Sequence, residues 1–332
     1  MTQDSATLAE GVLEGNRRAL ARAITLIEST RHDHRAAASD LLQRLMPHSG
    51  QSIRLGISGV PGVGKSTFIE AMGNHVIDEG HKVAVLTVDP SSAISGGSIL
   101  GDKTRMELLS RRPEAYIRPS PAGKTLGGVT RRSREALILC EAAGFDVIIV
   151  ETVGVGQSET RVADMTDMFL LLLLPGGGDE LQGIKRGIME LADLIMINKA
   201  DGDQVALAGR SAAEYRNALR LLHPRSRDWK VEVQTCSALD GNGIAEAWAL
   251  VLSHREALES SGQFSQRRAA QARDWMWSEV NDSLVAALQS DPEVRKRIPS
   301  LEAAASEGRI APTIAARQLL EVFLKRHKEW DS

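Results

Sequence analysis

The sequence is poor in cysteine and contains no long apolar run. Only two of its 332 residues are cysteines, Cys140 and Cys236, and neither lies near a CxxC or Cys/His spacing. A disulfide framework and a structural zinc site are therefore not indicated, and we expect two buried, reduced thiols. The most apolar stretch, Met168 to Pro175, is far too short to span a bilayer.

The chain also lacks a strong charge of either sign. Its formal net charge is −3 and its pI is about 6.3, so nothing favours nucleic acid or an anionic membrane as the main partner. Asp4, Glu10 and Glu14 make the N-terminus unlike a secretory signal and too acidic for an organellar transit peptide. We therefore expect a cytoplasmic protein that binds neither nucleic acid nor membranes.

Short apolar runs and longer amphipathic stretches alternate through the middle of the chain. Each run is about as long as a buried strand, and the connections are long enough to hold helices. This alternation predicts an α/β fold with a mostly parallel central sheet flanked by helices. The predicted strands are 53–57, 83–88, 147–150, 168–174, 194–197 and 231–233.

Helical patterns occupy both ends of the sequence. Residues 6–46 have helical periodicity that Pro47 and Gly50 close, whereas residues 259–266 look like a linker before a second helical region. We therefore predict a helical extension (1–50), a nucleotide-binding core (51–258) and a helical arm (259–332). Trp275 and Trp277 fall on different helix faces, so either one of them meets a partner or both pack within the chain.

A phosphate-binding loop follows the first predicted strand. Residues 59–66 read Gly-Val-Pro-Gly-Val-Gly-Lys-Ser and match GxxxxGK[ST] between a strand and a helix that begins at Lys65. Glycines in such a loop let backbone N–H groups surround a phosphate, and the helix N-terminus adds positive potential. Lys65 is predicted to approach the β- and γ-phosphates as a catalytic residue, and Ser66 to bind Mg²⁺. The predicted phosphate-binding residues are Gly59, Pro61, Gly62, Val63, Gly64, Lys65, Ser66 and Thr67.

Two further predicted strands end in carboxylates. Asp89 follows the second strand, and Glu151 opens the sequence Glu-Thr-Val-Gly, a variant of DxxG whose Gly154 N–H can contact a γ-phosphate. We predict that Asp89 and Glu151 are catalytic and, with Ser66, hold Mg²⁺, which needs few protein ligands. Asp89 has an alternative reading as a turn residue before Pro90. Asp102 is either another metal-side carboxylate or a helix cap.

The segment after Glu151 lacks one residue that GTPases of the Ras type use. In those proteins a water-positioning glutamine directly follows the glycine of this motif, whereas this chain has Val155 there and its nearest glutamine is Gln157. We therefore expect slow intrinsic hydrolysis of nucleotide, unless another group orients the attacking water.

A base-binding motif follows the strand predicted at 194–197. Asn198-Lys-Ala-Asp201 matches NKxD, in which the Asp201 carboxylate accepts from the N1–H and 2-amino groups of guanine. Adenine offers no such donors and would leave the acid unpaired, so the motif predicts GTP rather than ATP. Lys199 is expected to cover the base, and Asn198 to tie this loop to the phosphate loop. Ser237-Ala238-Leu239 fits the loop whose backbone N–H meets guanine O6.

Together these segments resemble the MeaB/ArgK/MMAA family of GTPases. The resemblance rests on 59–66, 88–92, 151–158, 174–182 and 198–201, and 174–182 (Leu-Pro-Gly-Gly-Gly-Asp-Glu-Leu-Gln) discriminates most because general P-loop GTPases lack it. It implies a P-loop NTPase fold of the SIMIBI type with helical extensions at both ends. It also implies a homodimer formed through the C-terminal arm, with GTP and GDP as substrate and product and Mg²⁺ as cofactor.

The resemblance further implies a nucleotide-switched chaperone of adenosylcobalamin-dependent methylmalonyl-CoA mutase that gates cofactor loading and protects the mutase. Residues 176–185 would then be a switch loop, and an ordinary flexible connection is the alternative reading of its three consecutive glycines. Two alternatives are a protein kinase of amino-acid transport and a nickel metallochaperone GTPase. The second needs a Cys/His cluster, whereas the eight histidines are scattered along the sequence.

Overall fold

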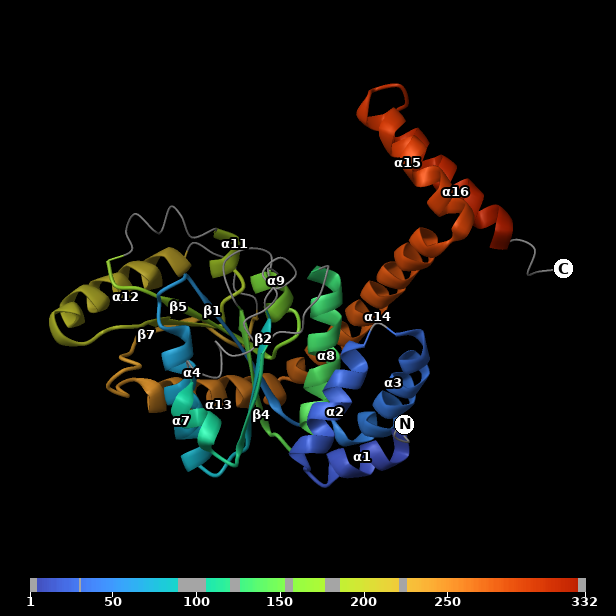
Figure 1. Ribbon diagram of the computed structural model, residues 1–332. Coiled ribbons are helices and arrows are strands. Elements are labelled where there is room, and N and C mark those ends of the chain that lie inside the picture. Colours follow the sequence, from blue (N-terminus) through green and yellow to red (C-terminus); the bar gives the residue numbers. More distant parts are fainter. Residues whose placement is uncertain are drawn as a thin grey trace. The chain divides into compact units, whose positions relative to one another are not determined.

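The computed structural model describes residues 5–29, 31–88, 106–119, 126–152, 158–176, 186–220 and 226–327. The chain forms two compact units, Met1–Gln271 and Ala272–Ser332 (Figure 1). The first contains the sheet and all the sequence motifs described above. No described helix is both long enough and apolar enough to cross a membrane.

The first unit is built on a parallel sheet in the order β3-β2-β4-β1-β5-β6-β7. This confirms the predicted α/β fold with a parallel central sheet. The six predicted strands are present, and a seventh, β3, was not predicted. The strands are β1 (Ile53–Gly59), β2 (Val83–Val88), β3 (Ala115–Arg118), β4 (Val147–Thr152), β5 (Met168–Leu173), β6 (Leu194–Ile197) and β7 (Glu232–Thr235).

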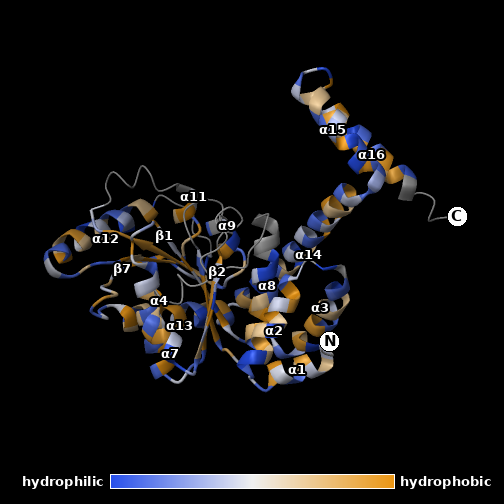
Figure 2. Cartoon of the chain, in the orientation of Figure 1, coloured by the Kyte–Doolittle hydropathy of each residue, from blue (hydrophilic) through white to orange (hydrophobic). Residues whose placement is uncertain are grey.

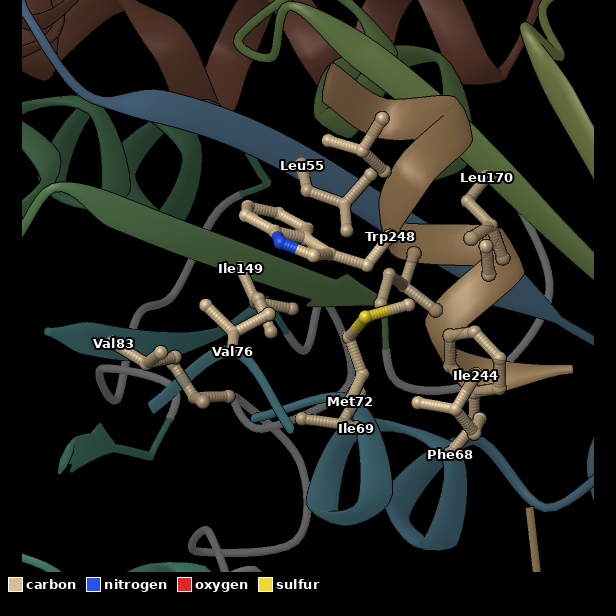
Figure 3. Packing of buried hydrophobic residues seen from close by; sticks show 14 of the residues in the cluster. Leu55, Phe68, Ile69, Met72, Val76, Val83, Ile149, Leu170, Ile244 and Trp248 are labelled. Atoms are coloured by element: carbon tan, nitrogen blue, oxygen red, sulfur yellow. The ribbon is translucent and has the colours of Figure 1, made fainter. Parts of the chain in front are cut away.

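Both faces of the sheet are covered, which explains why its strands are apolar on both sides. On one face, Leu55, Ile149 and Leu170 pack in one hydrophobic cluster with α4 (Lys65–Asp78) and with Trp248 of α13 (Ile244–Ser260) (Figure 3). Helices α8 (Leu126–Ala142), α9 (Ser158–Ala163) and α12 (Val205–Leu219) contact the strands from the other side. Figure 2 shows the apolar strands between these helices.

The N-terminal helices form a layer outside α8. Helices α1 (Ser5–Leu13), α2 (Arg17–Glu28) and α3 (His32–Leu45) pack on one another and on α8. Asn16 caps α2, because its Oδ1 atom accepts from the N–H groups of Arg18 and Ala19. The remaining short helices are η1 (Met46–His48), α7 (Glu107–Arg111), α11 (Arg186–Met189) and η2 (Gly202–Gln204).

The linker expected at 259–266 is mostly helical. Helix α13 extends to Ser260 and α14 (Gln263–Ser290) begins three residues later, so only Ser261 and Gly262 separate them. The hydroxyls of Ser260 and Ser261 bond to carbonyls four residues earlier, which keeps these residues compatible with the end of a helix. In the second unit, α15 (Pro292–Ser306) and α16 (Pro312–His327) pack on each other.

An aspartate precedes each of three strands and joins it to the neighbouring strand. Each aspartate accepts a hydrogen bond from an N–H group of the neighbour through its carboxylate, and its own N–H returns a bond to the same residue's carbonyl. This reciprocal pairing satisfies backbone groups where the strands begin. The pairs are Asp146 with Lys82, Asp167 with Arg54, and Asp193 with Phe169.

A buried ion network lies at the same amino edge of the sheet. Arg54 donates two hydrogen bonds of 2.9 Å to Glu141, and Arg268 of α14 donates two of 2.7 Å to Asp167. Glu141 also accepts from the Ser52 hydroxyl at 2.5 Å, and Arg268 lies 3.5 Å from it. Each carboxylate therefore has a charged partner, which a buried charge requires.

Candidate nucleotide-binding site

The predicted phosphate loop connects β1 to α4, as the motif requires. Gly59 ends β1, where an added Cβ would lie 2.5 Å from the Leu172 carbonyl oxygen of the neighbouring strand. Gly64 has φ +91°, and a Cβ there would lie 2.8 Å from Asn198 Nδ2. Both positions therefore need glycine, for lack of space and, at Gly64, for its left-handed backbone as well.

The polar side chains of this motif lie in the first turn of α4. Lys65 Nζ donates to the carbonyl oxygens of Gly59 at 2.6 Å and Val60 at 3.4 Å, so the ammonium group lies over its own loop. Ser66 is half-buried, and Thr67 is exposed, as are Pro61 and Gly62 at the loop's tip. The predicted phosphate-binding residues are thus contiguous and partly open to solvent.

Asn198 joins the phosphate loop to both segments of the base-binding region. Its Nδ2 atom donates to the Val63 carbonyl at 2.8 Å, and its Oδ1 atom accepts from the Ala238 N–H at 3.1 Å. The Cys236 thiol lies 3.5 Å from the same oxygen. Asn198 is 2 % exposed, so this junction is part of the core. The predicted link from Asn198 to the phosphate loop is confirmed.

Asp201 and the loop after β7 lie together on the other side of this junction. Asp201 Oδ2 accepts a 2.7 Å hydrogen bond from the Ser237 hydroxyl, which fixes one carboxylate oxygen. Lys199 is exposed and has φ +60°, the one positive value among the described residues other than glycine. Leu239 is 81 % exposed. The structure therefore brings Asn198, Asp201 and the predicted Ser237–Leu239 loop together.

Glu151 lies on the sheet face that α4 covers. It follows Ile149 by two positions on β4 and pairs in register with Ile57 of β1, and both isoleucines belong to the cluster that contains α4. Because α4 begins with Lys65 and Ser66, Glu151 lies at the same edge and on the same face as the phosphate loop. Glu151 is 5 % exposed.

The donors at this edge fit a magnesium ion in chemical type. A Ser66 hydroxyl and a Glu151 carboxylate offer oxygen, which Mg²⁺ prefers, and Mg²⁺ needs few protein ligands because it retains water. Three other predicted residues, Asp89, Asp102 and Gly154, lie outside the described residues. Within the described ranges, no three His, Cys, Asp or Glu side chains are grouped as a metal site.

Both cysteines are buried, as predicted. Burial raises the pKa of Cys140 well above its ordinary value and raises the pKa of Cys236 to about 12. Both side chains are therefore neutral thiols at physiological pH, and neither is prepared for a reaction or for metal binding as a thiolate.

Sequence reasoning missed two features of this region. The Ser237 N–H donates to the Asn242 carbonyl, which closes the loop after β7. Thr87, one residue before the end of β2, is 2 % exposed and its hydroxyl has no hydrogen-bond partner among the described residues. A threonine in the otherwise apolar strand 83–88 was a visible signal for the second feature.

Comparisons of sequence and of structure with known proteins find relatives that match most of this chain. Residues 20–293 match the family described as "Methylmalonyl Co-A mutase-associated GTPase MeaB". The chain is 49% identical over 327 residues to a mouse (Mus musculus) protein named "Methylmalonic aciduria type A homolog, mitochondrial", covering 96% of this chain and 79% of the other. It is 46% identical over 321 residues to "GTPase ArgK" of Escherichia coli K12, covering 96% and 97%. The solved structure of a "LAO/AO transport system kinase" superposes with a TM-score of 0.77 at 39% identity, covering 98% and 99%.

Proposed function

Because the chain belongs to the MeaB family of methylmalonyl Co-A mutase-associated GTPases, we propose that its GTPase activity acts as a switch on an adenosylcobalamin-dependent methylmalonyl-CoA mutase. In this role the protein gates loading of the cofactor into the mutase and protects the mutase from inactivation. The observation that carries the proposal is the family match over residues 20–293, because that family is described by its association with this mutase.

The phosphates of GTP bind, in this proposal, to the backbone N–H groups of residues 59–66 at the N-terminus of α4. Lys65 Nζ, now bonded to the carbonyls of Gly59 and Val60, directs its charge at the β- and γ-phosphates. Thr67 contacts the α-phosphate from the exposed side of the helix. Gly154 senses the γ-phosphate through its N–H group.

Mg²⁺ is held, in the same proposal, by Ser66 and the carboxylates Asp89 and Glu151, with Asp102 as a further metal-side group. When bound, this ion neutralises charge that develops on the phosphate oxygens during hydrolysis. Glu151 supports this proposal because it lies on the sheet face that α4 covers, at the edge where α4 begins with Lys65 and Ser66.

Asp201 selects guanine by accepting hydrogen bonds from its N1–H and 2-amino groups. The Ser237 hydroxyl supports this role because it already orients the carboxylate. Asn198 holds the base loop against the phosphate loop, so base and phosphates bind to one rigid junction. Lys199 is exposed beside that junction and is proposed to cover the base, and a backbone N–H of the loop Ser237–Leu239 is proposed to bind guanine O6.

We also propose that the helical arm, 259–332, forms a homodimer. Large apolar side chains of the second unit are exposed to solvent, which is typical of surfaces that bind another protein. They are Met276, Trp277, Val280, Leu284 and Val285 on α14, and Ile314, Leu320 and Leu324 on α16. Sedimentation equilibrium should give a dimer for the wild type and a monomer for Leu284→Glu, and a wild-type monomer would contradict the proposal.

A binding experiment tests the mutase proposal. The protein loaded with GDP, with a non-hydrolysable GTP analogue or with no nucleotide is titrated into methylmalonyl-CoA mutase, and the affinity is measured by calorimetry. We expect the affinity to differ between nucleotide states. Equal weak binding in all three states would refute the switch role while leaving the GTPase activity intact.

The likeness to a "LAO/AO transport system kinase" favours one alternative, a protein kinase that transfers the γ-phosphoryl group of GTP. Incubation with γ-labelled GTP distinguishes the two activities. Label recovered only as free phosphate supports hydrolysis, and label on a protein side chain supports the kinase.

A further inference from the structure

Thr87 places a buried hydroxyl in the apolar strand β2. Its side chain is 2 % exposed, and Val83 and Val85, which share its face of the strand, belong to the main hydrophobic cluster. Among the described residues its Oγ1 atom has no hydrogen-bond partner. A buried hydroxyl without a partner costs free energy, so its presence here calls for a specific explanation.

The position of this hydroxyl in the sheet suggests what its partner is. Thr87 pairs in register with Glu151 of β4, and Glu151 pairs in register with Ile57 of β1. All three residues therefore face the side of the sheet that α4 covers, near the strand ends where the phosphate loop begins. The Thr87 hydroxyl thus lies beside the carboxylate that we propose to hold Mg²⁺.

A second threonine at the same edge shows the opposite behaviour. Thr152, the last residue of β4, is fully buried, and its hydroxyl lies 2.8 Å from the Ser58 hydroxyl of β1. It belongs to the other face of the sheet, because it directly follows Glu151. A buried hydroxyl at this edge can therefore be satisfied within the chain, whereas the Thr87 hydroxyl has no partner in the part of the chain that the structure describes.

We propose that Thr87 is a positioning residue whose hydroxyl gains its partner, a water molecule bound to Mg²⁺, when the metal and nucleotide bind. This inference rests on the proposed Mg²⁺-dependent function of the site. The hydroxyl would orient the hydration shell beside Glu151 and would contribute to metal affinity without touching the nucleotide.

Melting temperatures of the full chain test this role without measuring turnover. Wild type, Thr87→Val and Thr87→Ser are melted without ligand, with GDP and excess EDTA, and with GDP and increasing Mg²⁺. Thr87→Val should melt no lower than wild type without ligand, because valine fills the same space and no hydrogen bond to a described residue is lost. It should need about 10- to 100-fold more Mg²⁺ for half of the metal-dependent shift, the usual effect of removing a group that orients a metal's ligands. Thr87→Ser should restore most of the metal response.

Thr152→Val is the matched control, because it removes a hydroxyl that is already paired. It should melt lower than wild type without any ligand. If Thr87→Val also melts lower without ligand, or if it responds to Mg²⁺ as the wild type does, the inference is wrong. If the wild type itself shows no Mg²⁺-dependent shift, the proposed metal site fails and the inference fails with it.

Discussion

The two edges of the parallel sheet differ in how their polar groups are satisfied. At the amino edge, Asp146, Asp167 and Asp193 each bond to a neighbouring strand's backbone and each lie near a cationic or protonatable side chain. Asp146 lies 2.6 Å from His81, and Asp167 lies 2.7 Å from Arg268. Asp193 lies 3.5 Å from Arg267 and 3.9 Å from His254. At the carboxyl edge, Gly62 at the tip of the phosphate loop is exposed, Lys65 bonds to carbonyls of its own loop, and the Thr87 hydroxyl lacks a partner among the described residues.

This difference suggests that the amino edge stabilises the fold and that the carboxyl edge binds a ligand. Groups that the chain itself satisfies hold the strands in register, whereas groups that it leaves available are suited to a ligand, as expected for the carboxyl edge of an open α/β sheet. Substitutions at the amino edge should therefore lower the free energy of unfolding and spare nucleotide binding. At the carboxyl edge, substitutions of the groups that face the proposed nucleotide should do the reverse, whereas Thr152, which is already paired with Ser58, contributes to stability.

The largest effect is expected for Arg268→Met, at the amino edge. The change leaves the Asp167 carboxylate without its bidentate partner and removes one of the positive charges near Glu141. The free energy of unfolding should therefore fall by about 3–5 kcal/mol. Urea denaturation measures this loss, and Arg273→Met, at an exposed arginine, is the control that should change little. An Arg268→Met variant with normal stability, or one that stays folded but has lost GDP affinity, would contradict the assignment of the amino edge to stability.

Lys65→Ala should have the next largest effect, at the carboxyl edge. Loss of a charge that stabilises the transferring phosphoryl group should lower the GTP hydrolysis rate by about 10²- to 10³-fold, or below detection. Phosphate release under saturating GTP measures it. Lys82→Ala removes the same charge from an exposed residue before β2 and should hydrolyse GTP normally. Retained hydrolysis in Lys65→Ala would disprove the assigned role of the lysine.

Asp201→Asn tests base selection. The neutral amide no longer offers two acceptor oxygens to guanine, so preference for GTP over ATP should fall by about 10- to 100-fold. Competition between GDP and ADP for a fluorescent nucleotide gives this ratio. Asp203→Asn, an exposed neighbour in η2, should keep the original preference. Unchanged preference in Asp201→Asn would mean that the base is read elsewhere.

The smallest effect concerns acid stability. Burial tends to raise the pKa of Glu141, but hydrogen bonds and charge from Arg54, with help from Ser52 and Arg268, leave this pKa below its ordinary value of 4.5. The Glu141 carboxyl therefore binds a proton more readily in the unfolded chain than in the folded one. Its contribution to stability is complete above the pKa that it has in the unfolded chain, and it is lost as the pH falls through the lower pKa that it has in the folded chain. Melting temperature between pH 7 and pH 3 should fall less steeply for Glu141→Gln than for wild type. An equal slope would show that this carboxylate is not responsible.

The sequence motifs predicted the fold class and the neighbourhood of the site well. Five of the six predicted strands were visible as compact apolar runs, and the sixth, at 231–233, as alternating valines. The loop from Gly59 to Ser66 was visible because its spacing is fixed by phosphate geometry. Strand β3 was missed because its short run lies between Pro113 and Pro119, residues that are typical of loops, and its register with β2 defines it as a strand. The prediction of a linker at 259–266 was wrong because the serines and the glycine of this segment were interpreted as residues that end helices. Only Ser261 and Gly262 separate the two helices.

The sequence by itself determined features whose residues are close together in the chain. These are the predicted strands, the start of α4 at Lys65, and the motif that ends in Asp201. Tertiary structure alone decided which distant groups meet. It joined Arg54 to Glu141 and Asp167 to Arg268, and it placed the Thr87 hydroxyl beside Glu151 without a partner among the described residues. Local patterns report backbone conformation, whereas pairing between residues about a hundred positions apart depends on how strands and helices pack.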